Sequence, residues 1–319
     1  MRGSALVEAC HRYRGAVIRD PSTDLDDPAT DPTDLARLAA EEIAAATGSD
    51  RHDIVLVAGS GWAEAMATVG ECVAELPAAE ITGFAPSAVP GHRGVIRSVL
   101  VRAGPAVDDD AAAVRDGGID AAADRDAAPV RRVLVLGCRS HLYEGRGVRA
   151  VAHGVRTAAA AGCSVAVLTN GCGSIDVSWP PGTLVLIGDH INLTGASPLE
   201  GPRFLDLSEA YASRLRALCR TVDPSLPEGV YVQFRGPAFE TPAEVRMAAA
   251  LGGHLVGMST ALETVAAREA GLDVLGLSLV TNPAAGVTSA PLHHTEVLAA
   301  GRSAADRLAD FLARVLPLL

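Results

Sequence analysis

Short apolar runs that end in glycine or small polar residues alternate along this sequence with Ala-rich stretches of helical length. The runs DIVLVAGSG (53–61), SVAVLTNGCG (164–173) and DVLGLSLVTN (273–282) are continuous and rich in Val and Leu, which is typical of strands buried on both faces. Helical stretches lie near 34–47 and 148–161. The alternation predicts an α/β fold, a single α/β/α domain with a central mixed and largely parallel β-sheet.

The remaining pattern completes one large domain. Further strands are expected at 94–104, 130–138, 182–193, 229–236 and 254–260, and further helices at 63–70, 207–219, 242–252, 262–271 and 294–316. We assign residues 34–319 to this domain and residues 1–33 to an N-terminal helix and a flexible acidic segment. Residues 105–129 are rich in Ala and Asp without an apolar face, which predicts a disordered insertion between two strands.

The charge pattern excludes several classes of chemistry. The net charge is −11, which argues against a nucleic-acid-binding surface. The chain contains no lysine, so neither a Schiff base nor the lysine of a phosphate-binding GxxxxGK[ST] loop is available. A small anion can still bind where local arginines and backbone N–H groups outweigh the overall negative potential.

Cysteine usage and hydropathy bear on location. The six cysteines form no CxxC pair, which fits a reducing cytoplasm better than a disulfide framework or a zinc site. The first residues lack the apolar stretch of a signal peptide, and no run of about 20 apolar residues could span a membrane. We therefore expect a cytoplasmic protein that has no membrane partner.

Two glycine-rich strand ends are candidate anion sites. AGSG around Ser60 lacks the third glycine of GxGxxG, and Ala58 rules out the GxSxG elbow. What remains is a strand, a turn and a helix start that present N–H groups and a hydroxyl to an anion, or else a plain tight turn. TNGCG can offer amides near Gly171 from a second side. Cys172 has no local base, which favours a structural thiol over a nucleophile.

The segment GCRSHLYEG is the most specific single motif. At strand spacing, Arg139, His141 and Tyr143 would share one face. An arginine offers phosphate a planar fork of donors and a histidine offers one more. The alternative is a charged strand end that faces water, which the strongly apolar preceding strand makes less attractive.

Four further segments end strands or begin helices with polar groups. VPGHRG places His92 in a loop, where a single histidine is usually only solvated. RGPAFETPAE places Phe239 and Glu240 at the start of a helix, where a glutamate also interacts favourably with the helix dipole. The apolar strands LVGMST and SLVTNP supply the remaining candidates, which are Val256, Met258, Ser259, Thr281 and Asn282.

Taken together, these segments resemble the low-molecular-mass, trimeric class of purine nucleoside phosphorylases. The matching motifs run in order from about Asp53 to Val315, and they are GSG, PGHRG, RSHLYEG, TNGCG, DHINLTG, GPAFET, GMST, SLVTN and HTEVLAAG. Each motif alone is weak, whereas nine in the right order are a strong signal.

The resemblance implies a role for each matching residue. It implies a phosphate site of Ser60, His92, Arg139, His141, Gly171 and Ser259. It implies ribose contacts from Tyr143, Met258 and His294. It implies a purine pocket of Phe239, Glu240, Val256, Thr281 and Asn282. His92, Glu240 and Asn282 are the implied catalytic residues, and Phe204 is the candidate for a phenylalanine that closes the ribose side of the neighbouring subunit in a homotrimer.

The implied reaction is phosphorolysis, which gives a free purine and (deoxy)ribose 1-phosphate. Inorganic phosphate is the co-substrate, and neither a cofactor nor a metal is expected. At the base, an amide at Asn282 can donate to N7 and the 6-oxo group, while Glu240 can accept from the ring N–H. Asn282 therefore favours inosine and guanosine, since related methylthioadenosine phosphorylases carry Asp there.

Departures from the family and rival functions remain open at this stage. Gly171 and Cys172 stand where the family often has alanine, and Pro283 replaces a lysine of the mammalian members. A 5′-methylthioadenosine phosphorylase, a hydrolytic nucleosidase and a non-catalytic purine-binding protein are the alternatives. A zinc enzyme that uses His293 and His294 is disfavoured, because adjacent residues point in different directions.

Overall fold

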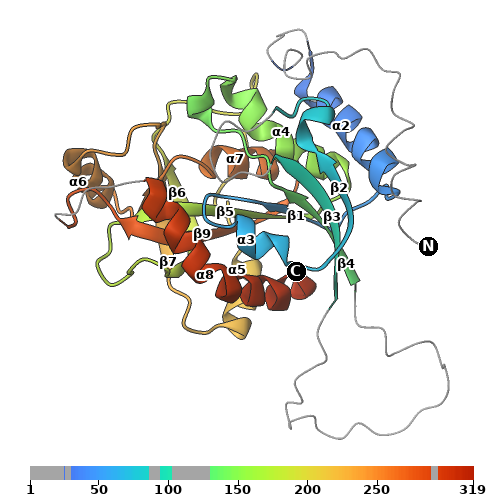
Figure 1. Ribbon diagram of the computed structural model, residues 1–319. Helices are drawn as coiled ribbons and strands as arrows, with labels where there is room; N and C mark the ends of the chain where they lie inside the picture. The colour runs from blue at the N-terminus through green and yellow to red at the C-terminus, as the bar shows by residue number, and fades with distance from the viewer. Residues whose placement is uncertain (1–24, 26–29, 86–93, 103–129, 289–293) are drawn as a thin grey trace, which may run out of the picture.

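The computed structural model describes Leu25 and residues 30–85, 94–102, 130–288 and 294–319. These residues form three layers, with a twisted sheet between two sets of helices (Figure 1). Most of the expected N-terminal segment, the 105–129 insertion and His92 lie outside the described residues. The expected α/β/α architecture with a central mixed sheet is confirmed.

The described strands make one nine-stranded sheet in the order β2-β3-β4-β1-β5-β8-β7-β6-β9. They are β1 (Ile54–Val57), β2 (Glu71–Pro77), β3 (Val95–Arg102), β4 (Val130–Leu136), β5 (Val165–Ser174), β6 (Leu184–Asn192), β7 (Glu228–Gln233), β8 (Leu255–Gly257) and β9 (Asp273–Pro283). β9 pairs with β5 as well as with β6. Strands β5, β8, β7, β6 and β9 therefore close into a ring, which leaves β9 without an exposed edge.

The sheet is less parallel than the sequence suggests. Strand β1 runs parallel to β4 and β5, and β5 runs parallel to β9. The pairings β2–β3, β3–β4, β5–β8 and β6–β9 are antiparallel. Strand β7 also runs parallel to β6 and β8, so five of the nine described pairings are parallel and four are antiparallel. Parallel pairings are thus a narrow majority in a mixed sheet, because strands buried on both faces are apolar whichever way they run.

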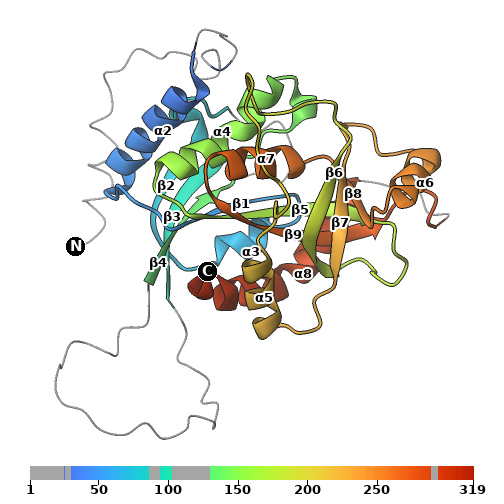
Figure 2. The ribbon, with the colours of Figure 1, turned by 180° about the vertical axis from the view of Figure 1, so that it is seen from behind.

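Helices cover both faces (Figures 1 and 2). One layer holds α2 (Pro32–Thr47), α4 (Gly147–Ala160) and α7 (Ala261–Glu269), and the other holds α3 (Ala63–Ala67), α5 (Ser213–Val222) and α8 (His294–Val315). Helix α6 (Pro242–Ala250) lies at one end of the molecule. Two separate apolar clusters fill the spaces between these layers and the sheet. Within the described residues, no helix is long and apolar enough to cross a membrane.

Local polar contacts explain two shifted helix boundaries. Helix α2 begins at Pro32, not at residue 34, because Asp31 accepts from the Thr33 N–H and caps it. The helix expected at 207–219 begins only at Ser213, since Asp206 instead accepts from the N–H and hydroxyl of Ser208 in a turn.

Candidate active site

The turn after β1 packs directly against the middle of β5. The Gly59 N–H donates to Thr169 Oγ1 at 2.9 Å. A Cβ atom on Gly59 would lie 2.5 Å from the Cα of Asn170, so only glycine fits there. Gly61 has a φ of 83°, which glycine adopts without strain. The turn thus holds the half-buried Ser60 close to the centre of the sheet.

Arg139 reaches the same stretch of β5 from the segment that follows β4. Its side chain is buried, and its Nε donates to Glu263 Oε1 at 2.9 Å. Its Nη1 donates to the carbonyl oxygen of Thr169 at 2.5 Å. Its Nη2 is buried and has no partner among the described residues. One planar N–H₂ group is therefore left to donate to an anion held beside Thr169.

His141 and Tyr143 lie together in a different way from that expected. Strand β4 ends at Leu136, and residues Leu142–Glu144 form a short 3-10 helix, so the prediction of one shared strand face is wrong. The rings of His141 and Tyr143 stack with centroids 4.8 Å apart. Glu144 Oε1 accepts from the His141 N–H and lies 3.1 Å from His141 Nδ1. A turn, not strand alternation, holds the two rings together.

Met258 and Ser259 come from the end of β8. A Cβ atom on Gly236 would lie 2.5 Å from Met258 Sδ and 2.9 Å from Tyr143 Cδ1. Tyr143 and Met258, the two expected ribose contacts, therefore converge on Gly236 beyond the end of β7. Ser259 is buried, and its N–H donates to Tyr231 Oη at 3.4 Å.

The expected purine contacts gather near the end of β5. A Cβ atom on Gly173 would lie 3.1 Å from Val256 Cγ2 and 3.3 Å from Asn282 Nδ2. The Thr281 hydroxyl lies 2.8 Å from Asn282 Oδ1, which orients the side-chain amide. Strands β5, β8 and β9 thus bring Val256, Thr281 and Asn282 together around Gly173.

Glu240 lies just before helix α6 and does not cap it. The capping role falls to Glu244, whose Oε2 accepts from the Thr241 N–H at 2.7 Å. Glu240 is 7% exposed, and its Oε1 has no partner among the described residues. Burial raises the pKa of Glu240, and the charge of Glu244 raises it further. Phe239 beside it is 41% exposed.

Strand β5 connects the two halves of this region. Arg139 contacts it at Thr169 and Asn282 approaches it at Gly173, four residues further along. At the rise of an extended strand, the two contacts are about 13 Å apart. This separation suits an anion at one end and a heterocyclic base at the other, joined by a sugar.

Comparison with known proteins identifies the family. The model of the phosphorylase superfamily matches residues 53–317. Purine nucleoside phosphorylase of Cellulomonas sp. is 55% identical over 296 residues, which cover 92% of this chain and 97% of that protein. The chain belongs to the purine nucleoside phosphorylase family. It is therefore a pentosyltransferase whose substrates are a purine nucleoside and inorganic phosphate.

Other relatives of this phosphorylase agree. The Mycobacterium tuberculosis purine nucleoside phosphorylase is 48% identical, over 91% of this chain and 98% of that protein. A Schistosoma purine nucleoside phosphorylase solved in complex with guanosine superimposes with a TM-score of 0.72. It is 28% identical, over 90% of this chain and 97% of that one.

The structure does not test the expected roles of three residues of the phosphorylase. His92 lies outside the described residues, and His294 begins helix α8 but its side chain is not described. Phe204 is 98% exposed in the connection between β6 and α5. Their roles stay predictions.

Cys172 is a structural thiol in this phosphorylase. It is buried, and its Sγ donates to the carbonyl oxygen of Leu279. Burial raises the pKa of the Cys172 thiol to about 12, so it is not a thiolate at neutral pH. Across the described part of the chain, no three His, Cys, Asp or Glu side chains form a group that could hold a metal ion.

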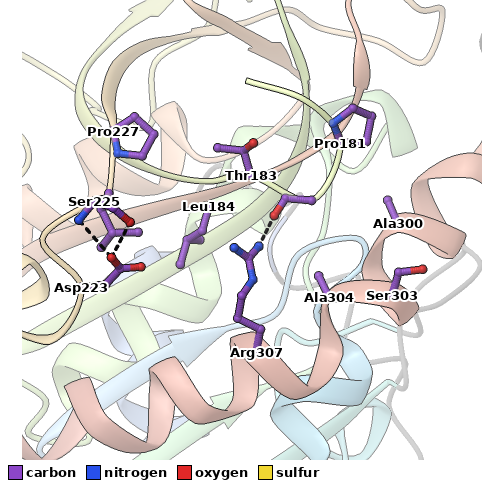
Figure 3. Close-up of a pocket in the computed structure, with 12 residues that line it drawn as sticks. Pro181, Thr183, Leu184, Asp223, Ser225, Pro227, Ala300, Ser303, Ala304 and Arg307 are labelled. Atoms are coloured by element: carbon purple, nitrogen blue, oxygen red, sulfur yellow. Dashed lines mark hydrogen bonds between the residues drawn. The ribbon is translucent and has the colours of Figure 1, made fainter. Parts of the chain in front are cut away.

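A separate cavity of about 590 Å³ lies between the start of β6, the end of α5 and helix α8 (Figure 3). Arg307 donates there to the carbonyl oxygen of Gly182, and Asp223 accepts from Ser225. None of the expected site residues lines it. The substrate site of the phosphorylase is therefore to be sought at the strand ends.

Sequence reasoning missed Glu263, which binds Arg139. The segment around it appears only as an ordinary Ala-rich helix. The one available signal is a Thr followed three residues later by Glu, the pattern of a capping box at Thr260. That pattern predicts a helix start but not a contact with a residue 124 positions away.

Proposed function

We propose that this phosphorylase acts on 6-oxopurine nucleosides, namely inosine, guanosine and their 2′-deoxy forms, and serves purine salvage. The single observation that carries the proposal is an oriented side-chain amide at Asn282 beside Val256. One N–H of Asn282 Nδ2 donates to the Pro283 carbonyl oxygen at 2.8 Å, which leaves the second to donate to N7 or to a 6-oxo group. A 6-amino group would instead meet a donor and remain unpaired, which costs binding free energy.

The mechanism follows from the charges that develop. In the transition state the ribose resembles an oxocarbenium ion and the leaving purine gains negative charge. Arg139 Nη2, Ser60, His92, His141, the backbone at Gly171 and Ser259 hold the phosphate nucleophile. Asn282 then stabilises the charge at N7, and Glu240 accepts the ring N–H of the base. The buried Oε1 of Glu240, which has no partner in the part of the chain that the structure describes, supports this role.

Known complexes of similar structures do not distinguish a preference for 6-oxopurines from one for 6-aminopurines. Schistosoma mansoni purine nucleoside phosphorylase has been solved with inosine and also with adenosine. Occupancy in a crystal is therefore a weaker criterion than turnover. For this reason the preference is argued from Asn282 and tested by kinetics.

The test is base release from guanosine, inosine, adenosine and 5′-methylthioadenosine, with and without phosphate. We expect phosphate-dependent release from the first two and kcat/KM at least tenfold lower for adenosine. A preference for methylthioadenosine would assign the chain to the rival phosphorylase. Equal release without phosphate would assign it to the nucleosidases.

We propose in addition that the enzyme assembles as a homotrimer in which Phe204 contacts the ribose side of the neighbouring subunit. Support comes from its near-complete exposure in the single chain, which is unusual for a large apolar side chain.

A further inference from the structure

One buried carboxylate links two segments of the proposed phosphate site. The Glu263 side chain is 4% exposed and lies in the first turn of α7. Its Oε1 accepts from Arg139 Nε at 2.9 Å, and its Oε2 accepts from the Thr260 N–H at 3.0 Å. Each carboxylate oxygen therefore binds a different part of the site.

The turn at Thr260 needs such a contact. Thr260 is the one described residue other than glycine with a positive φ, at 83°. This conformation is unfavourable for a β-branched residue, so surrounding contacts must hold it. Glu263 Oε2 does so through the backbone, and Asn170 Nδ2 donates to Thr260 Oγ1 at 3.0 Å. The orientation of Ser259, directly before Thr260, depends on this turn.

The same carboxylate fixes the guanidinium of Arg139. Nε is held by Glu263 and Nη1 by the Thr169 carbonyl oxygen, so the plane of the group cannot rotate. Nη2 is the group left to face an anion. By charge alone, Glu263 would weaken phosphate binding, because its negative charge offsets that of the arginine.

We propose that Glu263 is a positioning residue for phosphate, acting through Arg139 and through the Ser259–Thr260 turn. The proposal rests on the assignment of Arg139 and Ser259 to the phosphate site. Geometry and charge predict opposite effects when the carboxylate is neutralised. If positioning dominates, phosphate binding weakens, and if charge dominates, it strengthens.

The test compares Glu263→Gln with Asp273→Asn as a matched control. Asp273 also binds two arginines, Arg214 and Arg268, but lies at the start of β9, far along the strand from Asn282. A glutamine keeps the shape but can accept from only one of the two donors, because its other end is an N–H₂ group. For each variant, KM for phosphate, KM for guanosine, kcat and the melting temperature are measured.

We expect Glu263→Gln to raise KM for phosphate at least tenfold while KM for guanosine changes less than threefold, and Asp273→Asn to change neither. Glu263→Asp, which is one methylene shorter, should lie between wild type and Glu263→Gln. An unchanged or lowered phosphate KM in Glu263→Gln would overturn the proposal. Failure of both Glu263 variants to fold, with Asp273→Asn folded, would assign the carboxylate to the fold and overturn it as well.

The variant Arg139→Ala distinguishes a failure of the Glu263 proposal from a failure of the phosphate-site assignment. A raised phosphate KM in Arg139→Ala with a normal one in Glu263→Gln would overturn only the role of Glu263. Normal phosphate kinetics in Arg139→Ala would instead remove Arg139 from the phosphate site and overturn the assignment on which the inference rests.

Discussion

A single amide at Asn282 is the residue on which base selectivity depends. Its Nδ2 lies near Gly173, and the Thr281 hydroxyl lies beside its Oδ1. Asn282→Asp replaces the donor with an acceptor, so a 6-amino group becomes the better partner. We expect the ratio of kcat/KM for adenosine to that for guanosine to rise at least tenfold, measured by base release. Unchanged guanosine turnover with inert adenosine would show that the base assignment is wrong.

Glu240 combines a proposed function with a cost in stability. Its carboxylate is buried, and one oxygen has no partner within the described ranges, so Glu240→Gln should stabilise the fold by about 1 kcal/mol at neutral pH. The same change should lower kcat/KM for guanosine at least tenfold. Urea unfolding and guanosine kinetics measure the two effects. Glu71→Gln, an exposed substitution at the start of β2, should change neither appreciably.

The pH dependence of the Glu240 effect has a defined sign. Burial raises the pKa of Glu240 above its ordinary value of 4.5, so the folded protein holds this proton more tightly than the unfolded chain. The group therefore contributes stability at low pH, and this contribution is lost as pH rises through the raised pKa. The difference in the free energy of unfolding between Glu240→Gln and wild type should grow as pH rises over that range and vanish below about pH 4. A pH-independent gap would contradict the assignment.

At the scale of elements, the turn after β1 depends on a close backbone approach. Gly59→Ala would place a methyl group against the Asn170 backbone, which cannot move without displacing β5. We expect a loss of about 3 kcal/mol in the free energy of unfolding and a raised KM for phosphate. Gly154→Ala is the control, because its methyl would meet side chains and no backbone, namely Leu136 Cδ1 at 3.1 Å and Phe84 Cε1 at 3.8 Å. Equal stability of the two variants would contradict this packing.

The two ends of the connection between β3 and β4 lie side by side at one end of the sheet. Arg102 and Val130 are paired in the antiparallel register, six residues from the Leu136 end that leads to Arg139. This distance is about 20 Å along the strand. Replacement of residues 103–129 by Asn-Gly should raise the free energy of unfolding by about 2 kcal/mol, because a shorter loop costs less entropy to close. Kinetics should be unchanged, and a loss of turnover would place the segment at the site.

At the scale of the whole molecule, the proposed trimer explains the exposure of Phe204. We expect Phe204→Ala to raise KM for the nucleoside at least tenfold, because a buried cross-subunit contact to the ribose would be lost. Light scattering gives the oligomeric mass, and Val177→Ala, another exposed apolar side chain, is the control. A monomeric wild-type enzyme, or unchanged kinetics in Phe204→Ala, would contradict the arrangement.

Strand direction, one edge strand and one stacked pair of rings could not be predicted from the sequence. Apolar runs indicate buried strands, but they carry no signal for direction, and so the antiparallel pairing of β6 with β9 was not foreseen. Strand β2, with the exposed sequence ECVAELP, gives almost no periodic signal and was missed. The stacked pair His141 and Tyr143 depends on a turn whose geometry sequence spacing does not encode.

The α/β class, most strands and helices, the absence of lysine chemistry and, through nine ordered motifs, the family can all be read from the amino-acid sequence. These follow from local periodicity and residue chemistry, which act over a few neighbouring positions. The contact of Arg139 with Glu263, and the approach of Val256 and Asn282 to Gly173, are visible only in the folded chain. Such contacts join residues far apart in the chain, and they depend on how the strands pair, which no local pattern specifies.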